Sequence, residues 1–300
     1  MKKLVIAGAN GFISRHLTRY FSNRDWHVYG LARRAEGLDS QCHYVEWDGK
    51  KLDDWMRVIN GCDVLINMAG RSINCRHNNE NKRQILESRV DSTRVLGEAV
   101  AQCKNPPSLW VNASAAGIYQ QSYTETHGES GEYGSDFMAD VVKTWEKTFF
   151  TVSIPTSVRR VALRTTMVVS NEPGNAYRYL NTLAKFGLGG KAGNGKQIVS
   201  WIHIEDVSPA IEYIMNHEDL IGPVNMTAPE VVSNTEMMSR FRKSVGALIG
   251  LPAPAWGVRI GAYLIGTAPE LVLNSYYVIP NKLLERGFVF KYAEMRPEEW

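Results

Sequence analysis

The first 17 residues, MKKLVIAGANGFISRHL, predict a strand, a tight glycine turn and the start of a helix. A short apolar run at 4–7 leads into Gly8 and Gly11, and a pattern that opens a helix begins at Phe12. A helix that starts directly after such a turn presents free backbone N–H groups and the positive end of its dipole, which suits a phosphate. Glycine matters in this turn because a Cβ would keep a pyrophosphate at a distance.

The spacing of the turn is G-x-x-G-x-x-S, which departs from the G-x-G-x-x-G of the usual dinucleotide fingerprint. Ser14 stands at the place of the third glycine, which normally permits close packing of the helix on the strand. A strand, turn and helix without any ligand is therefore an alternative interpretation of this stretch. The pattern favours a nucleotide over that alternative.

Composition and charge exclude several classes of partner. The chain of 300 residues is 44% hydrophobic, enough for a sizeable core in one large α/β domain or in a domain with a smaller neighbour. Its 34 basic and 31 acidic residues leave a net charge of +3. Because these charges are dispersed and form no run of one sign, we expect no nucleic-acid partner. We expect a small-molecule substrate, which the sequence does not identify, and the oligomeric state stays open.

Cysteine usage and hydropathy favour a reducing compartment. The four cysteines have no C-x-x-C spacing and are interpreted as free thiols, so neither a disulfide framework nor a metal site is expected. They are Cys42, Cys62, Cys75 and Cys103. No stretch approaches the roughly 18 apolar residues of a membrane span, and the run at 4–7 is too short for a signal peptide. We therefore expect a cytoplasmic protein without a membrane partner.

Strand and helix patterns alternate over the first half of the chain. After the opening unit, we expect strands at 27–32, 42–47, 63–70, 109–113 and 158–169. We expect helices at 52–59, 79–102 and 135–150, the last with Ser135 as its N-cap. This alternation predicts an α/β fold, a Rossmann-type doubly wound parallel sheet that binds its ligand at the carboxyl ends of the strands.

The chain changes character after residue 170. A loop at 171–175 precedes a helix to about 186, and the segment 187–195 is too rich in glycine for either regular element. A strand then leads into a helix within 200–216, and an apolar helical stretch covers 256–273. We therefore expect a nucleotide-binding domain at 1–170, to which 200–217 returns. A smaller C-terminal α/β substrate or lid domain is expected at 171–300.

Several motifs, taken together in their order and spacing, resemble those of a known superfamily. GANGFI at 8–13, NMAG at 67–70 and SWIHIEDV at 200–207 resemble the extended short-chain dehydrogenase/reductase superfamily. Its atypical, epimerase-like subgroup is suggested by AGRSIN at 69–74, ESRVDST at 87–93, DFMADVVKTWE at 136–146, GLGG at 187–190, VNMTAPE at 224–230 and IPNKLLERGFVF at 279–290. The resemblance covers essentially the whole chain. It implies a Rossmann domain that binds a nicotinamide dinucleotide and a smaller C-terminal domain that closes over the substrate.

The end of the second expected strand indicates which dinucleotide the sequence favours. NAD-preferring Rossmann sites carry an Asp or Glu there, which accepts a hydrogen bond from the ribose 2′-OH. This chain has Arg33 and Arg34 instead, and two guanidinium groups suit a 2′-phosphate. NADP(H) is therefore the expected cofactor, with two solvated arginines at a strand end as the alternative.

The expected cofactor site draws on the turn and on the resemblance. The turn contributes Gly8, Asn10, Gly11, Phe12 and Ile13. The resemblance implies that Asp48 and Gly49 lie near the adenine, that Ala69, Gly70 and Arg71 lie along the cofactor, and that Arg164 lies near the phosphates. Asp48 is alternatively a capping residue, and Arg164 is alternatively part of a salt bridge at the end of the sheet.

The catalytic pair of the superfamily is missing. Short-chain dehydrogenases use Tyr-x-x-x-Lys on a helix, where the spacing puts both side chains on one face and the ammonium lowers the phenol pKa. None of the 13 tyrosines here has a lysine four residues later. By alignment of DFMADVVKTWE, Phe137 stands at the place of the tyrosine and Val141 at that of the lysine, and neither can move a proton.

Ser114 and Lys143 remain as catalytic candidates. Ser114 is the only hydroxyl at the end of the fifth expected strand, where the superfamily has a serine or threonine, and it is alternatively a turn serine bonded to nearby backbone. Lys143, Asp136, Asp140 and Glu129 are candidates for a substitute acid–base group, each alternatively a helix-start or solvated charge. His203 is interpreted as a packed residue between domains rather than a base.

Two functions remain open at this point. The first is an NADP(H)-dependent oxidoreductase or epimerase that acts on a carbonyl or sugar-like substrate with an unconventional or water-mediated acid–base group. The second is an NADP(H)-binding sensor or regulatory protein without this chemistry, whose cofactor occupancy controls an interaction. The missing pair favours the second, and the intact substrate domain favours the first.

Overall fold

The computed structural model describes residues 2–172 and 175–300, which are built around one parallel sheet. Seven strands lie in the order β10-β6-β5-β4-β1-β2-β3. They are β1 (Lys2–Ala7), β2 (Trp26–Ala32), β3 (His43–Glu46), β4 (Val64–Asn67), β5 (Leu109–Ala115), β6 (Arg159–Thr165) and β10 (Gly222–Met226). Chain order reverses between β1 and β4, where doubly wound sheets bind their ligands. The predicted Rossmann-type α/β fold is confirmed.

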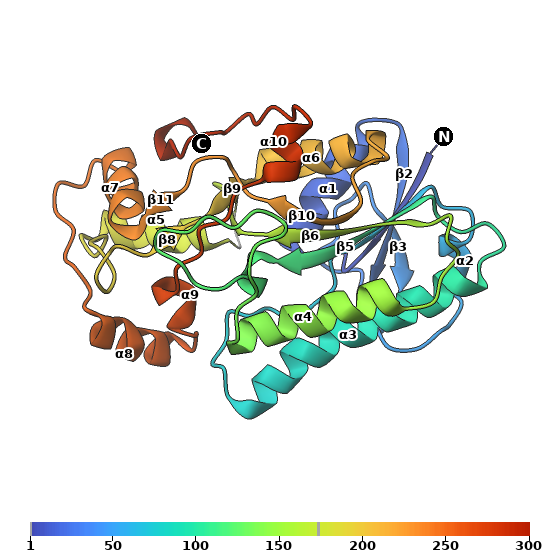
Figure 1. Ribbon diagram of the computed structural model, residues 1–300, viewed down its shortest axis with the longest axis horizontal. Helices are drawn as coiled ribbons and strands as arrows, with labels where there is room; N and C mark the ends of the chain where they lie inside the picture. The colour runs from blue at the N-terminus through green and yellow to red at the C-terminus, as the bar shows by residue number, and fades with distance from the viewer. Residues whose placement is uncertain (1, 173–174) are drawn as a thin grey trace.

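Helices cover both faces of the sheet (Figure 1). One face carries α1 (Phe12–Ser22), α6 (Ile204–Asn216) and α10 (Asn281–Glu285). The other carries α2 (Met56–Ile59), α3 (Asn79–Gln102) and α4 (Phe137–Thr151). Side chains alternate along β1, so that Leu4 and Ile6 pack toward α1 and α6 while Val5 packs toward α3. Burial on both faces explains why these strands are continuous apolar runs in the sequence.

A second, smaller assembly extends from one end of the sheet (Figure 1). Its helices are α5 (Ala176–Lys185), α7 (Asn234–Ser244), α8 (Ala255–Ile265) and α9 (Glu270–Leu273). Its strands form an antiparallel pair, β8 (Ile198–Val199) with β11 (Val232–Ser233), and a parallel pair, β7 (Met167–Val169) with β9 (Trp201–His203). Two 3₁₀ turns, η1 (Ala116–Ile118) and η2 (Pro297–Glu299), complete the elements. Phe241, Tyr177 and Trp201 lie at the centre of this assembly's own core.

Two long predicted elements are divided in the structure. The expected strand at 158–169 is wrong, because β6 ends at Thr165 and β7 pairs with β9 instead of with the main sheet. Between them, the N–H of Thr166 donates to the carbonyl of Met226 at 3.1 Å, the last such bond to β10. The helical stretch at 256–273 is divided at Gly266, which ends α8 with a left-handed φ of +77°.

The predicted N-cap of α4 is wrong by one residue. Asp136, not Ser135, precedes the helix, and its carboxylate accepts a hydrogen bond from the N–H of Ala139 at 2.9 Å. Both residue types cap helices well, so the local sequence did not distinguish them. The expected helix at 52–59 is confined to Met56–Ile59.

Segments beyond residue 170 return to the main sheet. Helix α6 lies on the α1 face, and β10 extends the sheet beside β6. Leu283, Phe288 and Phe290 also pack into the core on this face. The division of the chain into domains at residue 170 stays a prediction.

No helix within residues 2–172 and 175–300 is long and apolar enough to cross a bilayer. Nor do these ranges place three or more His, Cys, Asp or Glu side chains together as ligands for a metal ion. The four cysteines are free thiols.

Candidate cofactor-binding site

The glycine turn after β1 is packed tightly against the end of β4. Gly8 has a φ of +77°, a left-handed conformation that glycine adopts without strain. A Cβ at Gly8 would lie 2.8 Å from backbone atoms of Ala69, so the position has no room for a side chain. The N–H of Gly8 donates to the carbonyl of Leu31 at 2.9 Å. The turn therefore lies where β1, β2 and β4 end together.

Helix α1 begins directly after this turn and has no side-chain cap. Gly11 is its N-cap residue, and the first helical hydrogen bond runs from the N–H of Arg15 to the carbonyl of Gly11 at 3.0 Å. The N–H groups of the first turn, including those of Phe12 and Ile13, lack partners within the helix, which is the arrangement that binds phosphate. Ser14 is buried, and its hydroxyl donates to the carbonyl of Gly8 at 2.9 Å. The serine at the third-glycine position therefore stabilises the turn.

Arg33 and Arg34 are held next to the same turn. They directly follow β2, and the side-chain amide of Asn10 donates to the carbonyl of Arg34 at 3.1 Å and to that of Glu36 at 2.5 Å. Both arginine side chains are exposed. Within the part of the chain that the structure describes, neither guanidinium forms an ion pair with a carboxylate. Two cations thus lie beside the turn without an acidic residue of the protein to neutralise them.

Asp48 and Gly49 form a turn after β3. The Asp48 carboxylate accepts from the N–H groups of Lys50 at 2.8 Å and Lys51 at 3.0 Å, and Gly49 has a φ of +79°. Asp48 therefore stabilises a turn, and no helix begins there, since α2 starts at Met56. Its contact with an adenine stays a prediction.

The segment after β4 is held by polar side chains. Asn67, which is fully buried, accepts from the N–H of Ala69 at 3.0 Å. Ser88 of α3 accepts from the N–H of Arg71 at 2.9 Å, and the Arg71 guanidinium donates to the side chain of Asn81 at 2.7 Å. These bonds fix 69–71 beside Gly8 at the switch point of the sheet. The structure thus brings 8–13, 33–34 and 69–71 to one edge of the sheet.

Arg164 lies at the same edge but three strands away from β1, in a buried network at the end of β6. Its side chain is fully buried, and it holds the Glu146 carboxylate through Nε and Nη2, both at 2.8 Å. Its remaining N–H groups donate to the hydroxyls of Tyr119 and Tyr133 and to the carbonyl of Glu129. Burial lowers the pKa of Arg164, but the bonds and charge of Glu146 outweigh burial and raise it. All five donors are engaged, so the predicted contact with phosphates, which stays a prediction, would require this network to rearrange.

The two catalytic candidates have different partners. The Ser114 hydroxyl is buried and donates to Glu146 Oε1 at 2.6 Å. Lys143 lies on the half-exposed side of α4, where its ammonium is 2.7 Å from the Asp140 carboxylate and 3.1 Å from the carbonyl of Gly134. Over the described ranges, no hydrogen bond joins Ser114 to Lys143. The catalytic roles of both stay predictions.

Two apolar side chains of α4 face η1, which directly follows β5. The Cβ of Met138 lies 3.5 Å from the position of a Cβ on Gly117, and Val142 packs with Ala116 and Ile118 of η1. These two residues are four apart and so share one face of the helix. Phe137 instead meets the ring of His77 edge-on at 5.4 Å. The alignment of Phe137 and Val141 with the catalytic pair of the superfamily stays a prediction.

Comparisons with known proteins place the chain in a family. Residues 4–226 match the model of the NAD dependent epimerase/dehydratase family, and residues 253–297 match a domain of unknown function, DUF1731. An epimerase family protein of Staphylococcus haemolyticus is 33% identical over 303 residues, which cover 99% of this chain and 97% of the relative. This chain belongs to the NAD dependent epimerase/dehydratase family. The resemblance to the epimerase-like subgroup of the extended short-chain dehydrogenases is confirmed.

Two solved structures of this epimerase family resemble the chain over nearly its whole length. A human epimerase family protein, isoform 2, solved with NADPH, has a TM-score of 0.86 and 26% identity, covering 99% of this chain and 98% of that one. A nucleoside-diphosphate sugar epimerase from Corynebacterium glutamicum has a TM-score of 0.77 and 28% identity, covering 98% of this chain and 56% of that one. The full-length agreement with the human structure includes the C-terminal assembly.

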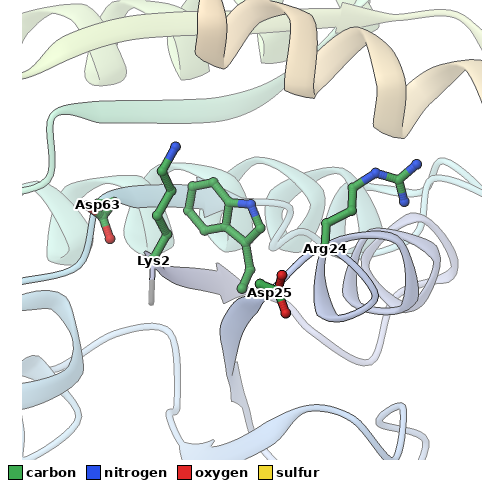
Figure 2. Close-up of a pocket in the computed structure, with 5 residues that line it drawn as sticks. Lys2, Arg24, Asp25 and Asp63 are labelled. Atoms are coloured by element: carbon green, nitrogen blue, oxygen red, sulfur yellow. The ribbon is translucent and has the colours of Figure 1, made fainter.

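A surface depression lies at the opposite edge of the sheet from this site. Figure 2 shows Lys2, Arg24, Asp25 and Asp63 around it, and Trp26 completes its lining. Lys2 and Trp26 are the first residues of β1 and β2. In epimerase-family sheets of this doubly wound type, ligands bind at the carboxyl ends of the strands, so this depression is not part of the candidate site.

Proposed function

We propose that this chain binds NADP(H) and acts as an NADP(H)-dependent oxidoreductase or epimerase on a small carbonyl or sugar-like substrate. The observation that carries the proposal is the uncapped N-terminus of α1 behind Gly8, with Arg33 and Arg34 held beside it. Membership of an NAD-dependent family supports the dinucleotide, and the human relative solved with NADPH supports the phosphorylated form.

The charge at the end of β2 favours NADP(H) over NAD(H). The acidic residue that would accept from a ribose 2′-OH is missing from this strand end, where β2 finishes at Ala32 and two arginines follow. A guanidinium forms a strong paired hydrogen bond with a phosphate, so removal of the 2′-phosphate would leave both arginines without this partner.

A bound nicotinamide would exchange a hydride with the substrate, and the protein would have to provide the accompanying proton. Met138 and Val142 cannot do so, and the Ser114 proton is donated to Glu146. We therefore assign the proton transfer to a group other than a Tyr–Lys pair, or to a water molecule.

Cofactor titrations test the binding half of the proposal. NADPH and NADH are titrated into the purified wild type and into Arg33→Ala and Arg34→Ala, with Arg57→Ala, an exposed arginine on α2, as the matched control. We expect NADPH to bind at least about tenfold more tightly than NADH, and each of the first two variants to reduce this preference. Equal affinities for both dinucleotides in the wild type would overturn the NADP(H) assignment.

A second candidate function is an NADP(H)-binding sensor without turnover. It is favoured by the sequence, which has Phe137 and Val141 where the superfamily has its Tyr–Lys pair. A panel of carbonyl compounds and nucleotide sugars, followed by NADPH absorbance, separates the two candidates. Turnover of any compound supports the enzyme, whereas tight NADPH binding with no turnover across the panel supports the sensor.

A further inference from the structure

Arg89 differs from the other arginines of α3 because it has no acidic partner. Arg83 pairs with Glu80 and Glu87, and Arg94 pairs with Glu98. Among residues 2–172 and 175–300, by contrast, no carboxylate forms an ion pair with Arg89. Its Nη1 donates to the backbone carbonyls of Arg71 at 3.0 Å and Ile85 at 2.9 Å. A half-buried cation is therefore compensated only by two neutral acceptors.

Arg89 is packed against other groups of the protein, so the absence of a neighbouring anion makes its charged form less favourable in free energy. The guanidinium carbon lies 5.2 Å from the centre of the Trp145 ring and would lie 3.3 Å from a Cβ on Gly70. Burial against these groups lowers the pKa of Arg89 to about 10. The stacking on an aromatic ring offsets part of this cost but does not replace a paired anion.

The two nitrogen atoms of Arg89 that donate no hydrogen bond, Nε and Nη2, form the side of a guanidinium that commonly binds anions. Nε and Nη2 have no hydrogen-bond partner in the described chain, and neither atom is fully buried. Arg164 uses these same two atoms to hold the Glu146 carboxylate, each at 2.8 Å. Parallel N–H groups of this kind match the two oxygens of a carboxylate or phosphoryl group. Arg89 therefore presents the same fork as Arg164, but without a carboxylate of the protein in it.

Arg89 also lies at the ligand-binding edge of the sheet. Gly70 follows the carboxyl end of β4, and chain order reverses between β4 and β1. A dinucleotide in such a sheet spans this switch point, with one mononucleotide on each side. Arg33 and Arg34 lie on the β2 side, and Arg89 lies on the β4 side, together with the backbone of Gly70 and Arg71.

We propose that Arg89 is a ligand-binding residue whose Nε and Nη2 receive an anionic phosphoryl or carboxylate group on the β4 side of the switch point. The anion comes either from the dinucleotide or from a substrate beside it. The placement of the dinucleotide rests on the proposed function. The recognition of an anion by Arg89 rests on its own contacts.

Arginine side-chain NMR tests the recognition directly. The Nε–Hε signal of Arg89 is identified by its loss in Arg89→Lys, and the wild type is titrated with inorganic phosphate, with citrate and with NADPH. We expect at least one of the three to shift this signal while the signal of Arg94, paired with Glu98, stays in place. No shift of the Arg89 signal with any of them would overturn the proposal.

Affinities then distinguish the source of the anion. Arg89→Met keeps an apolar stem against Trp145 but removes the charge, and Arg94→Met is the control on the same helix. If the dinucleotide supplies the anion, Arg89→Met weakens NADPH by about 10- to 100-fold and leaves 2′,5′-ADP, which lacks the nicotinamide half, unchanged. If the substrate supplies it, NADPH binding is unchanged, and citrate or phosphate binding to the NADPH complex weakens by a similar factor. Unchanged affinity for all of these ligands would overturn the proposal.

NADPH binding by the chain and anion binding by Arg89 are tested by different measurements. A wild type that does not bind NADPH contradicts the proposed function, yet the phosphate and citrate titrations still decide the role of Arg89. If Arg89→Met does not fold, Arg89→Lys keeps the charge without the fork, and the wild-type NMR titration does not depend on either variant.

Discussion

The carboxyl end of β1 and the carboxyl end of β5 lie on the same edge of one sheet, but their polar groups are used differently. After β1, helix α1 begins without a side-chain cap, and the neighbouring Arg33 and Arg34 are exposed. After β5, helix α4 is capped by Asp136, and Ser114 is bonded within a buried network. The guanidinium donors of Arg33 and Arg34 on the β1 side are exposed to solvent. The Ser114 hydroxyl on the β5 side instead donates its hydrogen bond to Glu146 of the protein. The β1 side thus has donors placed for a ligand, whereas the β5 side uses its donors to hold the protein together.

The largest expected effect comes from the β5 side. Glu146→Gln removes the charge that compensates the fully buried Arg164, so we expect a loss of about 3–5 kcal/mol in the free energy of unfolding, measured with urea. Glu98→Gln is the control, because its ion pair with Arg94 is exposed and is expected to contribute less than about 1 kcal/mol. Equal losses in the two variants would show that the β5 network is not structurally important.

A pH titration tests a capped helix on the opposite face of the sheet from α4, namely α6. His203 Nδ1 accepts from the N–H of Glu205 at the start of α6, and burial lowers the pKa of His203 to about 4 from its ordinary 6.5. The folded protein then binds fewer protons than the unfolded chain between pH 6.5 and 4, so stability falls as the pH is lowered through this window. We expect this group to contribute on the order of 3 kcal/mol of that loss.

His203→Asn isolates this contribution. Asparagine keeps an acceptor for the helix N-terminus but does not titrate in the window. The variant is expected to show a shallower decline in unfolding free energy between pH 7 and pH 4 than the wild type. Parallel declines would mean that other groups control the acid sensitivity.

The next largest change in stability is expected in the glycine turn after β1. Gly8→Ala introduces a Cβ 2.8 Å from the backbone of Ala69 at a φ of +77°, whereas Gly61→Ala has a similar φ of +75° with no atom within 4 Å. We expect Gly61→Ala to lose about 1–2 kcal/mol from backbone strain alone. Gly8→Ala is expected to lose more than this and also to lose NADPH affinity. Full NADPH affinity in a folded Gly8→Ala protein would break the link between this turn and the cofactor.

The first half of the fold was predictable because its parallel strands are buried on both faces. Continuous apolar runs next to Gly8 and Asp63 mark β1 and β4, and helical spacing marks α3. The division between β6 and β7 was not predictable, because the run 158–169 stays rich in β-branched residues while the chain changes its pairing partner at Thr166. Which strand a residue pairs with is a tertiary property that a local pattern does not contain.

The residues on the β1 side were easier to predict from the sequence than those on the β5 side, for a related reason. The turn at 8–13 has its chemistry in consecutive residues, so spacing alone indicates it. Arg89 became a candidate only through contacts with Gly70, Arg71 and Trp145, which come from two segments distant in sequence, the one after β4 and α4. The orientation of Met138 and Val142 likewise depends on how α4 is rotated against η1. The sequence does not indicate this rotation, because residues 141 and 142 are both valine.

The smallest effect decides whether the β5 side takes any part in chemistry. Ser114→Ala removes one hydrogen bond to a carboxylate that Arg164 still holds, so we expect a loss of about 1 kcal/mol and unchanged NADPH affinity. Ser208→Ala is the control, because its buried hydroxyl has no partner in the described chain and its removal should cost almost nothing. If a substrate is found, turnover by Ser114→Ala should stay close to that of the wild type, since the Ser114 proton is directed at Glu146. Loss of turnover with this small change in stability would instead show that Ser114 reaches the ligand. The β1 and β5 sides would then differ in how their polar groups are bonded, but both would take part in function.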